Sequence, residues 1–132
     1  MHTFSVTTRE RNEMVEITDQ VRGAVRASGA REGICVVYCP HTTGAITVNE
    51  NADPDVVHDL MLWYGRVVPK QQHGFQHGEG NSDSHIKSTL VGPSATLLIS
   101  DGQLVLGRWQ GVFFCEFDGP RSRTVHVQVV GG

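Results

Sequence analysis

Short runs in which apolar and polar residues alternate dominate the chain and predict a protein built mainly from β-strands. Alternation of this kind buries one face of a strand and leaves the other face in water. It is clearest near the carboxyl end, where Thr124, His126 and Gln128 alternate with valines. The first two runs flank a charged turn and are expected to form a hairpin. The predicted strands are 4–6, 14–17, 34–39, 45–49, 95–100, 103–106, 109–117 and 123–130.

Two segments of the chain have helical spacing and recognisable ends. The first follows Thr18, a residue suited to cap a helix, and stops at Gly29, a residue that favours the left-handed backbone of a helix end. The second has the clearer start, because Asp53 is a good N-cap and Pro54 fits the first helical position. We expect this second helix to span residues 54–64.

A third, short helix is predicted after a long polar segment. Residues 66–80 contain glycines, glutamines and histidines without a sustained period, and loops of this length are usually functional or mobile. Ser82 or Asp83 is expected to cap the helix that follows. Ile86 and Leu90 are four residues apart and should therefore share the face that packs on the core.

The order of these elements indicates the fold class. Strands interrupted by single helices, with four consecutive strands at the end, favour an α+β protein rather than a series of β-α-β units. We expect two packed, mostly antiparallel β-sheets in a sandwich-like arrangement, with about three short helices. The length of 132 residues and the hydrophobic content of 39% favour a single domain over residues 1–132.

Composition and charge narrow the classes of binding partner and the cellular location that can be expected. Eleven basic and fourteen acidic residues give a net charge of -3, and the basic residues do not gather, so neither nucleic acid nor an anionic membrane is an expected partner. No apolar run approaches the roughly 20 residues of a membrane span. The start of the chain is too polar for a signal peptide, so a cytoplasmic location is expected. The three cysteines lie in apolar runs without a C-x-x-C pair, which is typical of buried, reduced thiols.

Residues 77–87 carry the densest chemistry in the sequence, with imidazole, carboxylate, amide, hydroxyl and ammonium groups between glycines. His41, His77 and His85 each lie beside small or hydroxylated residues at the end of an element, where sites are commonly built. Three neutral imidazoles suit Zn²⁺ or another transition metal with an open coordination position, and Glu79 or Asp83 could orient them or act as a base.

The same segment suits phosphate equally well. Asn81, Ser82 and Lys87 surround the start of the third helix, whose free N–H groups and positive dipole end attract anions. The metal and phosphate interpretations are compatible on one phosphorylated, metal-bound substrate. The residue types alone leave both open.

A second polar cluster precedes the second helix. Asn49 and Glu50 end an apolar strand, and with Asp53 they offer the hard oxygen ligands that suit Mg²⁺. The structural alternative is that acidic groups here complement the helix dipole and cap its first turn. Further along the chain, Arg121 is suited either to grip a phosphate or to form a salt bridge.

Three long blocks of the sequence resemble the signature blocks of the YjbQ family. They run from His41-Thr-Thr-Gly-Ala to Asn49-Glu50-Asn-Ala-Asp53-Pro-Asp, from His77-Gly-Glu-Gly-Asn81 to His85-Ile-Lys87, and from Leu106-Gly-Arg-Trp109-Gln-Gly to Asp118-Gly-Pro-Arg121. The resemblance implies a compact sandwich, a homotrimer and a site near the subunit boundary. It also implies a thiamine-phosphate synthase reaction, in which an aminopyrimidine methyl diphosphate is joined to a thiazole phosphate and pyrophosphate is released.

There are two alternatives to this synthase reaction: metal-dependent hydrolysis of a small phosphorylated metabolite, and a non-catalytic module that binds a metabolite or a metal ion. The expected cofactor is a divalent metal, Zn²⁺ or Mg²⁺. On the resemblance, the candidate residues take three roles. The metal ligands would be His41, His77 and His85; the phosphate contacts would be Asn49, Asn81, Ser82, Lys87 and Arg121; the catalytic carboxylates would be Glu50, Asp53 and Glu79.

Overall fold

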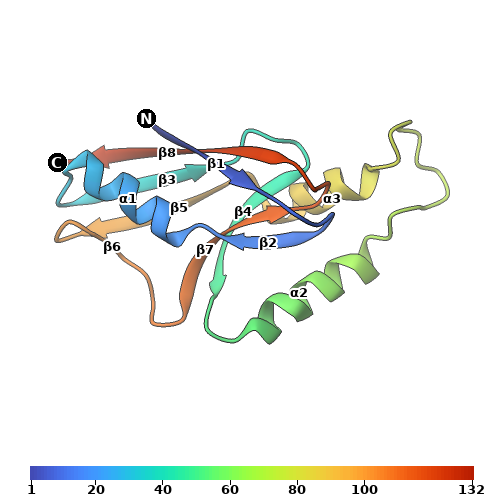
Figure 1. Cartoon of the computed structure of the whole chain (residues 1–132), viewed down its shortest axis with the longest axis horizontal. Helices are drawn as coiled ribbons and strands as arrows, with labels where there is room; N and C mark the ends of the chain where they lie inside the picture. The colour runs from blue at the N-terminus through green and yellow to red at the C-terminus, as the bar shows by residue number, and fades with distance from the viewer.

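Eight strands and three helices make up the computed structural model, which describes residues 1–132 (Figure 1). The predicted α+β class is confirmed. The elements follow one another as β1 (His2–Thr7), β2 (Glu13–Glu16), α1 (Thr18–Ser28), β3 (Gly33–Tyr38), β4 (Gly44–Glu50), α2 (Pro54–Val67), α3 (Ser82–Val91), β5 (Ser94–Ser100), β6 (Gln103–Leu104), β7 (Gln110–Glu116) and β8 (Ser122–Gly131).

All strand pairs are antiparallel, and they form two sheets. A five-stranded sheet has the order β1-β8-β3-β5-β6, and a three-stranded sheet has the order β2-β7-β4. The predicted hairpin of the first two strands is wrong, because β1 pairs with β8 and β2 pairs with β7. Val6 on β1 and Val15 on β2 pack on the same core from opposite sheets, an arrangement that a hairpin would prevent.

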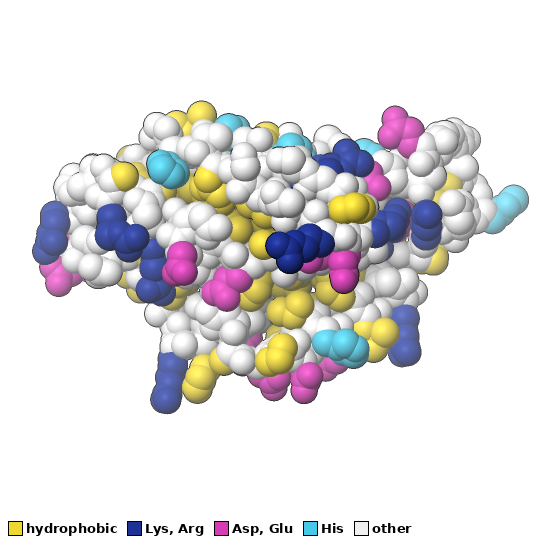
Figure 2. Space-filling model, viewed as in Figure 1, with side chains coloured by type: hydrophobic (Ala, Val, Ile, Leu, Met, Phe, Trp, Pro, Cys, Tyr) yellow, Lys and Arg dark blue, Asp and Glu magenta, His cyan; other side chains and the backbone are white.

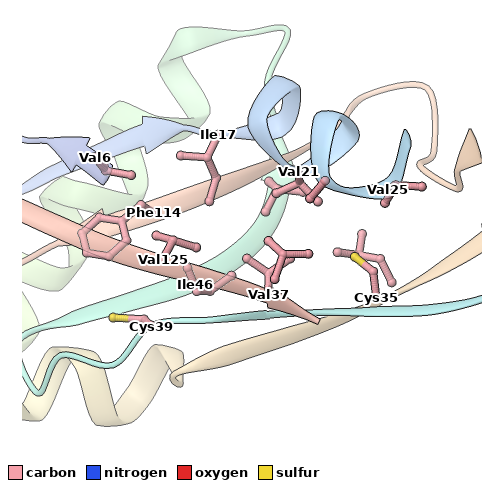
Figure 3. Close-up of a cluster of buried hydrophobic side chains, with 14 of the residues drawn as sticks. Val6, Ile17, Val21, Val25, Cys35, Val37, Cys39, Ile46, Phe114 and Val125 are labelled. Atoms are coloured by element: carbon pink, nitrogen blue, oxygen red, sulfur yellow. The ribbon is translucent and has the colours of Figure 1, made fainter. Parts of the chain in front are cut away.

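The main core lies between the two sheets and under helix α1 (Figure 3). Val21 and Val25 of α1 lie over Cys35 and Val37 of β3, while the fully buried Phe114 comes from the facing sheet. The thiols are free and buried, as predicted. Burial raises the pKa of Cys35 to about 11 and that of Cys115 to about 12.

Helix α1 begins differently from the prediction. Ile17 is the N-cap residue, and Thr18 is the first helical residue. The Thr18 hydroxyl donates to Glu16 at 2.8 Å and accepts the Val112 N–H at 2.9 Å, so it joins the helix to β7 instead of capping it. The predicted end is confirmed, since Gly29 adopts a left-handed φ of 72°.

Helix α2 begins as predicted and ends later. The Asp53 carboxylate accepts the Asp55 N–H at 2.9 Å, and Pro54 occupies the first turn. The helix continues through Gly65 to Val67, because an exposed glycine costs a helix only about 1 kcal/mol whereas Pro69 disfavours helical backbone in the residue before it. None of the three helices is long and apolar enough to cross a membrane.

Charges of both signs share the surface. On the face drawn in Figure 2, basic and acidic side chains are interleaved, and apolar side chains are visible in the middle of the molecule. This pattern gives no single-sign field over that face. Helix α3 lies at the end of the sheets from which the segment between α2 and α3 projects (Figure 1).

Candidate functional site

Helix α3 packs a polar face against the sheets. The predicted core residues Ile86 and Leu90 are 38% and 59% exposed, so that prediction is wrong. The elements beneath α3 present charged side chains and free carbonyl groups, which require polar partners rather than apolar ones. The buried residues of the helix are Asp83, Ser84, Lys87 and Ser88.

The Asp83 carboxylate is the centre of a buried charge cluster. Arg11 donates to both of its oxygens, each at 3.0 Å, and the Lys87 ammonium donates to one of them at 3.0 Å. Lys87 also donates to Asn12 at 3.3 Å, and only 4% of its side chain is exposed. The ammonium predicted to hold a phosphate is therefore occupied by a structural ion pair.

A second buried pair joins β7 to β8. Arg123 donates through two nitrogens to the Glu116 carboxylate, and both residues are almost fully buried. The same guanidinium donates to the carbonyl of Thr43 at 3.3 Å and to its hydroxyl at 2.9 Å, so it holds the loop that follows β3. The pattern of residues along the two strands did not predict this pair. The available signal was a charge at an apolar position in each of two strands.

The buried Asp83 and Glu116 carboxylates make the free energy of unfolding depend on pH. Burial alone would raise the pKa of Asp83, but hydrogen bonds and charge from Arg11 and Lys87 outweigh it and lower the pKa. Burial would likewise raise the pKa of Glu116, and Arg123, with further hydrogen bonds, lowers it. A pKa lowered on folding contributes stability above the unfolded pKa, and this contribution is lost as the pH falls.

We therefore expect the free energy of unfolding to fall as the pH drops below roughly 4, where carboxylates of the unfolded chain begin to take up protons. Urea denaturation at a series of pH values measures this fall. In Asp83→Asn the decline should be shallower, because one of the two contributing carboxylates has been removed. An equal slope in the variant and the wild type would contradict the assignment of Asp83.

The loop that carries His41 has no regular secondary structure but is held at several points. The His41 ring accepts the backbone N–H of Thr124 on its Nε2 at 2.9 Å. The carbonyl of Thr42 accepts the Ser88 hydroxyl at 2.5 Å, which ties the loop to α3. A loop fixed in this way keeps its side chains in one place, as a binding or catalytic site requires.

Two cavities lie on either side of His85. One has a volume of about 540 Å³ and contains His77, and the other has a volume of about 500 Å³ and contains His41. The rings of His77 and His85 are perpendicular, with centroids 5.4 Å apart. The first is lined by Gly74, Phe75, Gln76, His77, Ser82, His85 and Ile86, and the second by Tyr38, Cys39, Pro40, His41, Thr42, His85, Ser88, Thr89 and Pro93.

The structure does not assemble the predicted three-histidine metal centre within one chain. No three histidine, cysteine or carboxylate side chains converge on a common point. His77 is near His85, and Glu79 approaches His77 at 3.8 Å, but the Nε2 of His41 is already bonded to the backbone. The residues of a single chain therefore do not fit a complete metal site.

The carboxylates before α2 are remote from the histidines. Glu50 ends β4, a seven-residue strand that starts next to the His41 loop, so roughly 20 Å of extended chain separates the two. Glu50 accepts the Asp53 N–H at 3.2 Å, and Asn49 accepts the Glu50 N–H at 2.7 Å. Glu50 and Asp53 line a separate cavity, so one chain does not bring the two predicted walls of the site together.

Asp118 gathers two of the predicted phosphate contacts. Its carboxylate accepts from the Asn81 amide at 2.8 Å and from Arg121 at 3.2 Å. Asn81 is the N-cap residue of α3 but makes no side-chain cap, and its buried Oδ1 has no hydrogen-bond partner. Of the predicted phosphate contacts, Ser82 alone lines a histidine cavity.

A family model and relatives of this chain carry the same family description. A family model described as "UPF0047 protein YjbQ-like" matches residues 2–132. The UPF0047 protein MJ1081 of Methanocaldococcus jannaschii is 50% identical over 97% of this chain and 92% of its own length. The UPF0047 protein YugU of Bacillus subtilis is 44% identical, with 99% of each chain covered.

Solved structures agree with these relatives. An uncharacterised conserved protein of the YjbQ/UPF0047 family from Clostridium acetobutylicum superposes with a TM-score of 0.96 at 46% identity, covering 98% of this chain and all of that one. A YbjQ-like protein of unknown function from Sulfolobus solfataricus gives a TM-score of 0.94 at 31% identity, with 99% and 96% covered.

Proposed function

This chain belongs to the YjbQ-like UPF0047 family, and we propose that it binds small phosphorylated metabolites in the two cavities beside His85 and joins one to another. The proposed reaction is thiamine-phosphate synthesis. The ring nitrogen of a thiazole phosphate bonds to the methylene carbon of an aminopyrimidine methyl diphosphate, and the bond from that carbon to the diphosphate oxygen breaks. Diphosphate leaves with the electron pair of the broken bond.

The observation that carries the proposal is the position of His85 between the two cavities. Each cavity falls within the roughly 300–1,000 Å³ that small-molecule sites occupy. Two adjoining cavities that share one imidazole suit two substrates better than one, because the shared ring would contact both reacting groups. Imidazole can donate hydrogen bonds to phosphate oxygens and change its protonation near neutral pH.

His77 and His85 are proposed to contact the departing diphosphate. Ser82 lines the same cavity at the first turn of α3, where backbone N–H groups favour an anion. A Zn²⁺ or Mg²⁺ ion would further neutralise the leaving group. Because one chain does not complete a metal site, stabilisation of the departing diphosphate is assigned to His77, His85 and Ser82 alone.

A homotrimer is the proposed assembly. Helix α2 has no fully buried side chain and exposes Leu62, Trp63 and Val67 by 43% to 55%. The three-stranded sheet also leaves two unpaired edges, at β2 and β4. Exposed apolar side chains and free strand edges are usually covered by association. A monomer mass in light scattering at micromolar concentration would contradict this assembly.

His85→Ala is expected to lower the rate of thiamine phosphate formation at least 100-fold, the usual loss when a hydrogen-bond donor to the negative charge developing in the transition state is removed. Product formation and pyrophosphate release should be measured together. His2→Ala is the matched control, since His2 is exposed on β1 and lines neither cavity, so its rate should equal the wild type.

Other results would identify the alternatives. Phosphate released from either substrate alone would favour a hydrolase, because water would then replace the second metabolite. Tight binding of a substrate in calorimetry without turnover would favour a non-catalytic module. A His85→Ala rate equal to that of His2→Ala would contradict the proposed site.

A further inference from the structure

The His41 ring takes the place of a missing strand beside β8. Strand β3 ends at Tyr38, opposite His126, whereas β8 extends back to Ser122. The backbone N–H of Thr124 lies beyond the end of β3, and it donates to the Nε2 of His41 at 2.9 Å. The His41 side chain, from the loop after β3, thus satisfies the Thr124 N–H, a backbone donor that has no partner in the sheet.

This contact determines which ring nitrogen carries the hydrogen. A backbone N–H can only donate, so the Nε2 of His41 must be the acceptor. A neutral imidazole with an acceptor at Nε2 holds its hydrogen on Nδ1. No other group of the chain bonds Nδ1, and the ring lines the smaller of the two cavities beside His85.

We infer that His41 is a neutral hydrogen-bond donor that binds an acceptor oxygen of a phosphorylated ligand through Nδ1–H, and is not a metal ligand. A metal ion requires a free lone pair on an imidazole nitrogen. Both nitrogens are committed here, one to the Thr124 N–H and the other to its own hydrogen. The assignment of the ligand as a phosphate rests on the proposed function, whereas the position of the hydrogen does not.

The charges around the ring favour the same state. Burial and the positive charge of Arg123 on β8 lower the pKa of His41, with a smaller contribution from Arg121 in the same direction. Glu116 on β7 acts in the opposite direction, and its effect is smaller than that of Arg123. Protonation of the ring would also place a second hydrogen against the Thr124 N–H and break that bond. The neutral ring should therefore persist below neutral pH.

The cavity offers a second donor for the same ligand. Thr42 lines it, and the Thr42 hydroxyl makes no hydrogen bond within the chain, so it is free to bind an oxygen of the ligand. Its backbone carbonyl is held by Ser88, which keeps Thr42 beside His41. Two neutral donors can bind a phosphate oxygen without a cation in the cavity, because hydrogen bonds to a charged acceptor are stronger than those between neutral groups.

The test is nitrogen NMR of the intact protein labelled with ¹⁵N-histidine. Without ligand, His41 should carry its hydrogen on Nδ1, and this state should persist from pH 8 to a pH just below the ordinary pKa of histidine, about 6.5. Inorganic phosphate should shift the Nδ1 signal, and Zn²⁺ alone should leave it unchanged. A hydrogen on Nε2, or a signal that moves with Zn²⁺, would overturn the inference.

Variants separate this inference from the proposed reaction. His41→Ala should weaken inorganic phosphate binding about 10-fold or more in calorimetry, and His41→Asn, whose amide keeps a donor, should lose less. His2→Ala should bind as the wild type does. Inorganic phosphate bound with the His41 signal unmoved would overturn the donor role. A shifted His41 signal in a protein that makes no thiamine phosphate would instead contradict the reaction and support the donor role.

Discussion

Asp83→Asn is expected to lower the free energy of unfolding by about 3–5 kcal/mol, the usual cost of leaving a buried charge without its partner. The Asp83 side chain is fully buried, and Arg11 and Lys87 both bond it. Removal of its charge would leave two cations facing each other, one of them buried. Urea denaturation at neutral pH measures the loss.

Asp101→Asn is the control for this prediction. Asp101 forms an ion pair with Arg31, but the two side chains are 85% and 68% exposed. Water screens such a pair, so its loss should change stability by less than about 1 kcal/mol. If both variants lost the same small amount, the buried cluster under α3 would not be a main contributor to stability.

Glu116→Gln should be similarly costly, with a loss of about 3 kcal/mol or more. The Glu116 carboxylate accepts four hydrogen bonds, from Thr8, from the N–H of Asp118 and two from Arg123. An amide has one oxygen, so its NH₂ group would meet donors, and the buried guanidinium would lose its counter-charge. Urea denaturation again gives the size of the loss.

The same variant should also loosen the His41 loop. Arg123 holds Thr43 only while Glu116 holds Arg123, so faster hydrogen exchange is expected at the N–H of Thr124, which His41 protects. Glu32→Gln is the control, since the exposed Glu32 side chain bonds only Ser100 and the N–H of Asp101, which lie outside this network. A stable Glu116→Gln variant with unchanged exchange would show that the pair does not hold the loop.

Both buried pairs lie at the end of the sheets that carries the histidine cavities. One holds α3, which bears His85, and the other holds the loop that bears His41. Buried ion pairs add little net stability compared with apolar packing, but they allow only one geometry. Their position is what a site that needs fixed imidazoles would require.

Local sequence signals correctly predicted much of the fold. Alternating residues indicated the strands, and Asp53 with Pro54 marked the start of α2, because capping involves only neighbouring residues. The same reasoning failed at Ile86 and Leu90. Their spacing is helical, but the side of a helix that is buried depends on what lies beneath it, and here that is a charged surface.

Of the site, the sequence indicated the histidines but not their supports. His41, His77 and His85 were selected because they lie among small polar residues, and they do line the two cavities. Glu116 and Arg123 were missed because each lies at a buried position of its strand, where the alternation predicts an apolar side chain. Glu50 was placed with the histidines because its neighbours are polar, although strand β4 separates them.

The sequence by itself determined the fold class, most element boundaries, the buried thiols and the candidate histidines, since each depends on composition or on residues within a few positions. Only the tertiary structure decided which strands pair, which face of α3 is buried and which nitrogen of His41 is bonded. Those features depend on contacts such as that between His41 and Thr124, which are 83 positions apart. Local periodicity carries no information about contacts at that distance, because they form only when the whole chain packs.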